Sequence, residues 1–377
     1  MARVALELQP CCGNRSGIGT YAYEIAKRMH STTGLDFCGN VFNFMGREQQ
    51  HIVTSDFTFP IQYCKIMPYA LYRRMWNYLP LSYTSLFELP SDVGVFFDYI
   101  VPPRFSGKAI QVIHDLSYLQ YPETMNKRNL RRLRGELETS IARSSRIVTI
   151  SEFSRSEIVR MLRVPQEKID IVSPAPANTT FLMCGEEENN QAAKHTEPFV
   201  LYVGTLEPRK NLERLIQAFD MLKKTERIPH KLILAGGAGW GTEGISSAVR
   251  AASCADDIKF TGYVSVTEKR NLYQNADVFV FPSLYEGFGI PPLEAMEMNC
   301  PVVCANAASL PEVVGDAARL VDPWDVRSIA DGILNVLTDE EYANSLRQKG
   351  KKQFKKYTWD TSAERLTKIC CSVVEGL

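Results

Sequence analysis

Two glutamates in one short segment, Glu286 and Glu294, have the chemistry to hold the hydroxyl groups of a single ligand. They form a Glu-x7-Glu pair in Leu-Tyr-Glu-Gly-Phe-Gly-Ile-Pro-Pro-Leu-Glu-Ala-Met at 284–296, just after an apolar run at 277–281. Proline suits the first turn of a helix, so the two prolines predict a helix that begins near Ile290. Glu286 then lies in the loop before the helix and Glu294 lies on it.

This pattern places the two carboxylates on either side of a helix N-terminus, where backbone N–H groups attract anions. The arrangement suits a ligand with hydroxyl groups at both ends and phosphate in the middle. The alternative is that Glu294 only complements the helix dipole and that Glu286 is a solvated side chain. The two glutamates alone leave both interpretations open.

A second candidate site is a pair of cations, Arg209 and Lys210, which follow an apolar run at 199–203. They stand at the predicted start of a helix, where positive charge opposes the helix dipole. Local stability therefore does not explain them, whereas a phosphate site would use both cations and the helix N–H groups. The alternative is a solvated surface pair.

Glycine opens another predicted helix after the first strand, in the sequence Gly17-Ile18-Gly19. Two glycines there would let a phosphate approach the backbone closely, although a plain tight turn explains them too. With Ala22 they match the dinucleotide pattern G-x-G-x-x-A, but the match begins late after the strand. The acidic residue expected after the second strand is also absent, which argues against NAD or FAD.

His114 is the fourth candidate, because it directly follows an apolar run at 109–113. A histidine at the end of a strand can contact a substrate hydroxyl or take part in proton transfer. It can equally be a locally hydrogen-bonded cap.

The elements that must position these residues are short strands that alternate with helices. In the second half we predict strands at 199–203, 231–235, 258–261, 277–281, 301–304 and 318–321, and helices at 211–224, 267–275 and 290–298. In the first half we predict strands at 4–8, 93–97, 109–113 and 147–150, with a helix at 20–29. This alternation predicts α/β domains with doubly wound parallel sheets, which bind ligands beyond the carboxyl ends of their strands.

The chain length indicates two such domains, because 377 residues exceed what one core usually holds. The polar stretch at 185–198 has no periodicity and is interpreted as a linker. We therefore predict an acceptor-side domain at 1–190, joined by a last helix at about 358–377, and a nucleotide-sugar-binding domain at 191–357. Two facing sheets would place their strand-end loops along one interdomain cleft, which is the expected active site.

Composition excludes several classes of protein. Lys+Arg and Asp+Glu are both 43, so the zero net charge gives no support for nucleic-acid binding. No apolar stretch is long enough to span a membrane, and charges near the N-terminus do not fit a signal peptide. The ten cysteines show no C-x-x-C spacing. We therefore expect a cytoplasmic protein with reduced cysteines and no metal site.

These motifs together resemble one family, the retaining, nucleotide-sugar-dependent glycosyltransferases of the GT-B fold, glycosyltransferase family four. The resemblance rests on the Glu-x7-Glu segment, Gly-Thr-Leu-Glu-Pro-Arg-Lys-Asn, Gly-Ile-Gly, Val-Ile-His-Asp, Ile-Ser-Glu-Phe-Ser at 150–154 and Ser-Leu-Pro-Glu-Val-Val-Gly-Asp-Ala-Ala at 309–318. It is strongest from 199 to 325 and weak between 40 and 90, where such enzymes usually meet the acceptor.

The resemblance implies a role for each matching residue. Catalysis would involve Glu286, at the donor sugar's hydroxyls, and His114, near the sugar's sixth position. Glu294 would bind the ribose hydroxyls. The diphosphate would be held by Arg209 and Lys210 and covered by Gly17, Ile18 and Gly19. The backbone N–H groups of Gly287, Phe288, Gly289 and Ile290 would line the sugar. One departure is Phe96-Phe97-Asp98, where relatives often have a histidine.

The motif style further resembles bacterial mannosyltransferases that use GDP-mannose for surface polysaccharide such as O-antigen. It implies a hexosyltransferase with a glycan or lipid-linked acceptor, with dTDP-rhamnose or a UDP-hexose as alternative donors. Two other classes remain: a nucleotide-sugar epimerase, which donor incubated without acceptor would reveal, and a silent glycan-binding subunit. A silent subunit should have lost Glu286, Arg209 or Lys210, and all three are present.

Two further expectations concern metal ions and membranes. The sequence contains no D-x-D carboxylate pair of the kind that holds the metal in metal-using sugar transferases, so we expect no metal and no cofactor beyond the donor. The segments 69–78 and 126–134 mix arginines with aromatic or apolar residues. They could form a peripheral patch on anionic lipid through the first domain, or simply a solvated helix face.

Overall fold

The computed structural model describes residues 1–13, 16–46, 54–78, 80–125, 127–176 and 197–376. By Cα proximity these residues fall into two compact units. Unit 1 comprises Met1–Leu116, Lys127–Pro174 and Trp359–Leu377, and unit 2 comprises Ser117–Asn126 and Ala175–Thr358. The predicted boundary at 190/191 and most of the predicted linker lie outside the described residues.

Unit 1 is built on a parallel sheet whose strand order is β3-β2-β1-β4-β5-β6-β7 in the part of the chain described. The strands are β1 (Ala2–Glu7), β2 (Leu35–Phe42), β3 (Ile61–Cys64), β4 (Val93–Phe96), β5 (Lys108–Val112), β6 (Ser144–Thr149) and β7 (Ile169–Ile171). Its helices are α1 (Gly17–Arg28), α2 (Tyr69–Met75), α4 (Lys127–Arg143), α5 (Glu152–Leu162) and α13 (Trp359–Glu375).

Unit 2 has a parallel sheet of order β10-β9-β8-β11-β12-β13 over its described residues. The strands are β8 (Phe199–Val203), β9 (Lys231–Ala235), β10 (Ile258–Gly262), β11 (Val278–Phe281), β12 (Val302–Ala305) and β13 (Arg319–Val321). Its helices are α3 (Ser117–Gln120), α6 (Leu212–Thr225), α7 (Glu243–Ala251), α8 (Val266–Asn275), α9 (Ile290–Glu297), α10 (Leu310–Val314), α11 (Val326–Thr338) and α12 (Glu340–Gln353).

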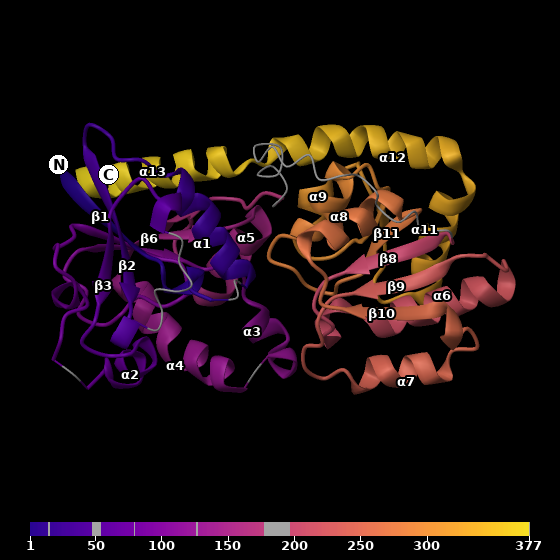
Figure 1. Ribbon diagram of the computed structural model, residues 1–377, viewed down its shortest axis with the longest axis horizontal. Helices are drawn as coiled ribbons and strands as arrows, with labels where there is room; N and C mark the ends of the chain where they lie inside the picture. Colours follow the sequence, from indigo (N-terminus) through magenta and orange to yellow (C-terminus); the bar gives the residue numbers. More distant parts are fainter. Residues whose placement is uncertain (14–15, 47–53, 79, 126, 177–196, 377) are drawn as a thin grey trace. The chain divides into compact units, whose positions relative to one another are not determined.

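Both sheets are doubly wound, and Figure 1 shows the helices of each unit around its strands. The central strands are buried along their whole length, as in β4, β8 and β11, because helices cover both faces of a parallel sheet. The strand order reverses between β1 and β4 in unit 1, and between β8 and β11 in unit 2. Ligands of doubly wound sheets bind at the carboxyl ends of the strands at such switch points.

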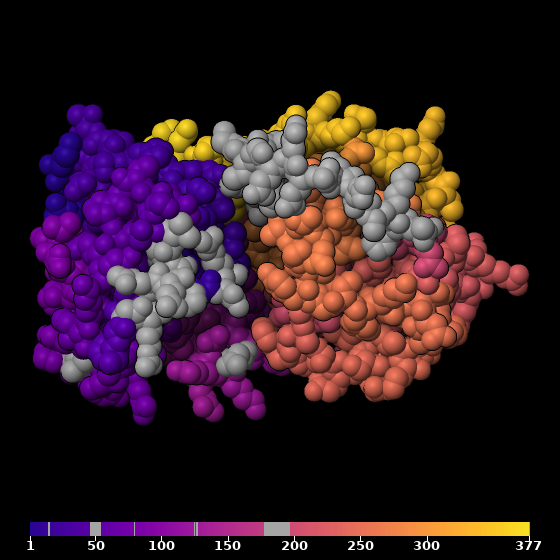
Figure 2. Space-filling view, viewed as in Figure 1, coloured from indigo at the N-terminus to yellow at the C-terminus, as the bar shows by residue number. Residues whose placement is uncertain are grey.

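The last helix, α13, belongs to the core of unit 1. Trp359 is 1% exposed, and its ring lies 6.1 Å from that of Tyr21 on α1. Ser362 donates a hydrogen bond to the carbonyl of Ser173 at 2.5 Å. In the space-filling view, yellow atoms of this last part of the chain lie among the violet atoms of the first part (Figure 2).

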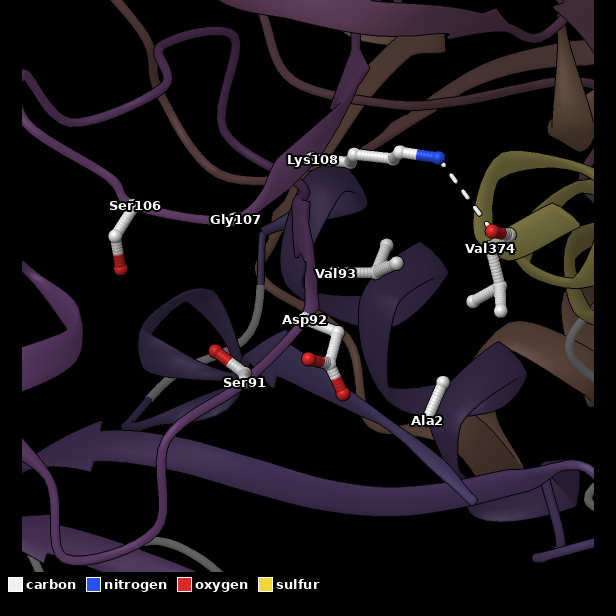
Figure 3. Close-up of a pocket in the computed structure, with 8 residues that line it drawn as sticks. All are labelled: Ala2, Ser91, Asp92, Val93, Ser106, Gly107, Lys108 and Val374. Carbon is white, nitrogen blue, oxygen red and sulfur yellow. Dashed lines mark hydrogen bonds between the residues drawn. The ribbon is translucent and has the colours of Figure 1, made fainter. Parts of the chain in front are cut away.

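The far end of α13 is held by a lysine from the sheet. Lys108, the first residue of β5, donates from Nζ to the carbonyl oxygens of Val373 at 2.6 Å and Val374 at 3.4 Å (Figure 3). A cation at a helix C-terminus satisfies carbonyls that have no partner within the helix and opposes the negative end of the dipole. The segment at 359–375 is thus fixed to unit 1 at both ends.

The structure corrects several predicted boundaries. The helix predicted at 20–29 begins earlier, at Gly17, so the glycines form its first turn instead of a loop before it. This is possible because Ser16 caps the helix and accepts from the N–H of Gly19 at 3.4 Å. Strands β3 and β7 were not predicted and β2 was expected without bounds, whereas every strand of unit 2 lies within two residues of its expected position.

Candidate active site

The predicted donor-binding residues of unit 2 lie at its switch point. Arg209 and Lys210 belong to a short 3-10 turn at Pro208–Lys210 that follows β8, and Glu286 lies in the loop that follows β11. Since β8 and β11 are neighbours in the sheet, the two loops meet at the same edge. The backbone N–H of Leu284 donates to the carbonyl of Arg209 at 2.9 Å, which joins the loops directly.

Four charged side chains form one cluster at this edge, Glu207, Arg209, Lys210 and Glu286, hereafter the charge cluster. Arg209 contacts Glu207 at 2.6 Å and Glu286 at 3.0 Å. Lys210 contacts the other carboxylate oxygen of Glu286 at 2.6 Å. Both glutamates are buried, Glu286 being 9% exposed, so the interpretation of Glu286 as a solvated side chain is wrong. The interpretation of Arg209 and Lys210 as a solvated pair is wrong too, because their ion-paired side chains are only 17% and 12% exposed.

The charge cluster keeps Glu286 ionised. Burial alone would raise the pKa of this carboxyl, but the charges of Arg209 and Lys210 outweigh burial and lower its pKa to about 2. An ionised carboxylate accepts hydrogen bonds and has no proton to give at neutral pH. Glu286 is therefore suited to accept from ligand hydroxyls or to stabilise positive charge, and unsuited to act as a general acid.

Glu294 lies one turn into α9 and is held from a neighbouring helix. Lys269 of α8 contacts one of its carboxylate oxygens at 2.7 Å, and the hydroxyl of Tyr273 donates to the other at 3.1 Å. The residue is 4% exposed. Because each carboxylate oxygen offers two lone pairs, both partners leave Glu294 capacity to accept from a ligand. The ion pair with Lys269 also shows that Glu294 does more than complement the dipole of its own helix.

The loop that leads into α9 offers backbone donors in an unusual arrangement. The helix begins at Ile290 as expected, but its second and third residues are prolines, which carry no N–H. An anion at this helix end would therefore depend mainly on the N–H groups of the preceding loop, 287–290. The side chain of Phe288 is buried, with its ring 5.1 Å from that of Tyr357, so only the backbone of this residue is a candidate contact for a ligand.

The loop conformation is set by Gly289 and by a buried serine. Gly289 has φ +106°, and a Cβ there would lie 2.6 Å from the side chain of Leu310, so only glycine fits. The hydroxyl of Ser309 lies 2.9 Å from the carbonyl oxygens of both Glu286 and Phe288. These contacts fix the backbone on both sides of Gly287.

The predicted site residues of unit 1 also follow strands, at the carboxyl edge of that sheet. Gly17, Ile18 and Gly19 open α1 after β1, and His114 follows β5. A Cβ on Gly17 would meet nothing within 4 Å, so the fold itself does not require glycine there. The structure thus leaves room at Gly17 for the close approach that a phosphate would need.

His114 is buried and neutral. Its Nε2 lies 2.9 Å from the carbonyl oxygen of Phe97, an acceptor, so Nε2 carries the proton. Burial lowers the pKa of His114, against the opposing effects of that hydrogen bond and of Asp115. The ring packs edge-on against Tyr21 at 5.1 Å. The neutral ring can accept a hydrogen bond at Nδ1, which suits contact with a substrate hydroxyl better than proton donation.

Sequence reasoning missed the residues that hold this site together. Asn211 has φ +61° and is 3% exposed, and its amide donates to the carbonyls of Pro282 at 3.1 Å and Pro323 at 2.7 Å. It therefore ties the turn at Arg209 to the loop after β11. Two indications were available for Asn211: its place in the segment Gly-Thr-Leu-Glu-Pro-Arg-Lys-Asn, and its residue type, because asparagine tolerates the left-handed conformation better than most residues. Glu207 and Ser309 also lie in segments that carry the resemblance, whereas Lys269 carried no indication.

The described residues contain no group of three or more His, Cys, Asp or Glu side chains arranged to hold a metal ion. Metal independence itself stays a prediction. Within the same residues, no helix is both long and apolar enough to cross a bilayer.

Comparison with known proteins places the chain in a family. Residues 185–353 match the family described as glycosyl transferases group 1. The O-antigen chain mannosyltransferase B of Escherichia coli is 36% identical over 274 residues, which is 70% of each chain. The protein belongs to this glycosyltransferase family. A serotype-specific mannosyltransferase of Escherichia coli, WbdA, is 30% identical over 68% of this chain, which spans only 32% of that longer protein.

The fold of the glycosyltransferase has close counterparts among solved structures. The sucrose-phosphate synthase of Thermosynechococcus elongatus superposes with a TM-score of 0.73 over 100% of both chains, at 17% identity. The predicted GT-B class, two doubly wound α/β domains, is confirmed. The predicted enzyme class, a glycosyltransferase, is confirmed by the family and by the relatives. The epimerase and silent-subunit alternatives are therefore set aside.

Proposed function

We propose that this glycosyltransferase transfers a hexose from a nucleotide sugar, mannose from GDP-mannose, to a glycan or lipid-linked saccharide in surface polysaccharide synthesis. The observation that carries the proposal is the charge cluster, which holds an ionised glutamate beside two cations at the switch point of unit 2. The choice of mannose is supported by the relatives named as O-antigen mannosyltransferases. The transfer proceeds with retention of configuration, as the family resemblance implies.

In this proposal the donor diphosphate lies against Arg209 and Lys210. The sugar hydroxyls donate hydrogen bonds to the carboxylate of Glu286, and the ribose hydroxyls donate to that of Glu294. The reaction breaks the bond between the anomeric carbon and a diphosphate oxygen, which keeps the electron pair, and forms a bond from that carbon to an acceptor oxygen. The acceptor hydroxyl passes its proton to an oxygen of the departing diphosphate. Negative charge grows on the departing diphosphate, and fixed cations stabilise such charge without reorganising.

The charge balance of the cluster supports a cationic role for Arg209 and Lys210. Glu207 and Glu286 neutralise the two cations while no ligand is present. An incoming diphosphate shares Arg209 and Lys210 with these carboxylates, and the N–H groups of the loop at 287–290 supply further donors. A metal ion is not needed in this scheme, and no cofactor beyond the donor substrate takes part.

Activity in excess EDTA tests the metal-free scheme. We expect turnover to persist in EDTA and to fall about 100-fold in Lys210→Ala, by analogy with the loss of one donor at an oxyanion site. Lys224 is an exposed lysine in the last turn of α6. Lys224→Ala is therefore the matched control and should keep full activity. If EDTA abolished turnover and Mg²⁺ or Mn²⁺ restored it, the assignment of Arg209 and Lys210 would be wrong.

A panel of nucleotide sugars tests the donor. GDP-mannose, dTDP-rhamnose and UDP-hexoses are compared first by thermal shift and then by hydrolysis and transfer. GDP-mannose should raise the melting temperature most, because at equal concentration the ligand that binds the folded state most tightly stabilises it most. The anomeric configuration of the product, read by NMR, tests retention. A stronger response to dTDP-rhamnose or to a UDP-hexose would replace mannose as the donor sugar while leaving the reaction class intact.

A further inference from the structure

Unit 1 contains a polar cavity that is separate from its candidate active-site residues. It has a volume of about 370 Å³ and lies between α2 and α4. Figure 1 shows these two helices next to each other along one edge of the unit. The lining includes four arginines, with one tyrosine and one glutamate: Arg73, Arg74, Arg128, Arg132, Tyr69 and Glu136. We call this cavity the arginine pocket.

The inner wall of the arginine pocket is organised by one carboxylate, that of Asp98. Arg132 contacts both oxygens of Asp98, at 3.0 and 3.2 Å, and Arg73 contacts one of them at 3.7 Å. The guanidinium of Arg73 also lies over the rings of Tyr69, at 5.4 Å, and Trp76, at 5.9 Å. Two arginines are therefore held in place before any ligand arrives, which lowers the entropy cost of using them.

The arginine pocket carries an excess of positive charge. Four guanidinium groups face two carboxylates, those of Asp98 and Glu136, and burial raises the pKa of Glu136. Glu7, at the end of β1, does not offset the excess. Burial, with a further contribution from the charge of Asp98, raises its pKa to about 8. Glu7 is therefore mostly neutral at pH 7.

Two buried atoms of the pocket side chains have no hydrogen-bond partner among the described residues: a donor, Nε of Arg132, and an acceptor, Oε2 of Glu136. Both are enclosed by protein atoms, so neither is counted toward a ligand. The exposed arginines Arg74 and Arg128 line the pocket and can supply donors to an acceptor-rich anion.

Its position relates the arginine pocket to the reaction. Asp98 follows β4, which is the neighbour of β1 at the switch point of unit 1. Gly17 to Gly19 follow β1, and His114 follows β5, so all three features lie at the carboxyl edge of one parallel sheet. In doubly wound sheets this edge is where ligands bind.

We propose that the arginine pocket binds a phosphate ester group carried by the acceptor. Guanidinium groups match the oxygens of phosphate with paired hydrogen bonds, and a cavity of this size holds a phosphate together with part of an attached sugar or alkyl chain. The proposal depends on the proposed function only for the identification of the ligand as the acceptor. The phosphate site itself does not depend on it. The pocket gives a discrete site to the segments 69–78 and 126–134, for which the sequence left open a peripheral patch on anionic lipid or a solvated helix face.

Direct binding of mannose 1-phosphate tests the pocket, measured by calorimetry on the full chain and compared with mannose. The pocket variant is Arg74→Ala with Arg128→Ala, two exposed arginines whose loss should leave the fold intact. The matched control is Arg131→Ala with Arg134→Ala, which removes the same charge from exposed positions of α4 outside the pocket. We expect the pocket variant to weaken binding at least tenfold and the control to bind as the wild type does.

Other outcomes would overturn the proposal. Equal weakening in both variants would show general charge attraction, and no binding at millimolar concentration would remove the site. Weakening in Arg209→Ala but not in the pocket variant would place the phosphate in the donor site instead. If transfer from nucleotide sugars failed while this binding pattern held, the proposed function would fall and the phosphate site would stand.

Vesicles distinguish the source of the phosphate. Flotation with phosphatidylglycerol vesicles, against phosphatidylcholine vesicles, is measured with and without mannose 1-phosphate. Competition by the sugar phosphate, with loss of flotation in the pocket variant, would identify a lipid-borne phosphate group in the pocket. Absence of flotation together with mannose 1-phosphate binding would identify a soluble phosphate ester. Flotation that mannose 1-phosphate does not inhibit, and that falls equally in both variants, would indicate general attraction of surface charges to the membrane. That outcome would contradict binding in the arginine pocket.

Discussion

Glu286 is one carboxylate shared between two cations, and its charge is what the proposed reaction uses. The variant Glu286→Gln keeps the shape of the side chain and removes the charge. We expect kcat to fall about 100-fold or more, because an interaction that develops in the transition state is lost. Circular dichroism and a melting curve establish that the variant is folded. A variant with full kcat would remove Glu286 from the site.

Glu294 should respond differently, because ribose is bound in much the same way before and during the reaction. Glu294→Gln is expected to raise KM for the donor with little change in kcat. The loss corresponds to about 1–3 kcal/mol for a hydrogen bond to a buried hydroxyl pair. Lys269→Met provides a comparison, since it leaves the carboxylate but removes its ionic partner. A change confined to kcat would contradict the ribose assignment.

The low pKa of Glu286 also predicts how stability depends on pH. Its pKa in the fold is about 2 against an ordinary value of 4.5, so ionisation stabilises the fold above pH 4.5. That contribution is lost as the pH falls from 4.5 towards 2, and it amounts to on the order of 3 kcal/mol. Urea unfolding of wild type and Glu286→Gln should show a constant stability gap above pH 5. This difference in the free energy of unfolding should narrow below pH 4.5. An unchanged difference at pH 3 would contradict the lowered pKa of Glu286.

At the scale of elements, a substitution in the first turn of α1 can distinguish whether glycine is needed there for the fold or for binding a ligand. Gly17→Ala places a methyl group where no atom lies within 4 Å, so stability should be unchanged or rise by up to about 1 kcal/mol. If a diphosphate approaches this turn, the same methyl group should raise KM for the donor. Gly135→Ala in α4 is the control, since it also meets nothing within 4 Å. Equal donor KM in both variants would count against a phosphate site at Gly17.

How far the sequence predicts these elements depends on how evenly apolar each strand is. Strands β8 and β11 of unit 2 are continuous apolar runs, because both faces of a parallel sheet are buried at its centre. β2 interrupts its apolar residues with aspartate, glycine and asparagine, and β3 buries a glutamine and a cysteine instead of aliphatic residues, so neither shows a clear pattern.

Within the candidate site, residue types and spacing predict Arg209, Lys210 and Glu286 but not their pairing. The pairing depends on the adjacency of β8 and β11, which local sequence does not encode. The same reason hides the arginine pocket, whose two helices are far apart in the chain and are joined through Asp98. Charges can thus be recognised from sequence, whereas their partners require the strand order.

At the scale of the whole molecule, the two units should respond separately to damage in α13. Trp359→Ala removes a side chain that is 1% exposed in unit 1, at an expected cost of about 3–5 kcal/mol. Trp324→Ala in unit 2 is the control, because this tryptophan is 55% exposed and contacts Arg214 at 4.8 Å, which is worth about 0.5–1 kcal/mol. Calorimetry should show one transition lowered strongly by Trp359→Ala. A uniform shift of the whole melting profile would contradict independent units.

The return of α13 to unit 1 also has a consequence for the newly made chain. Trp359–Leu377 is translated after all of unit 2, although it belongs to the core of unit 1. At roughly 5–20 residues per second, the ribosome needs on the order of 10–40 s to pass from the end of the earlier part of unit 1 to this helix. Throughout that interval the surface that later receives Trp359 stays uncovered, while the main segment of unit 2, Ala175–Thr358, emerges without interruption. The half of the protein made second can therefore be complete first, and the nascent first half is the part that a chaperone would have to shield.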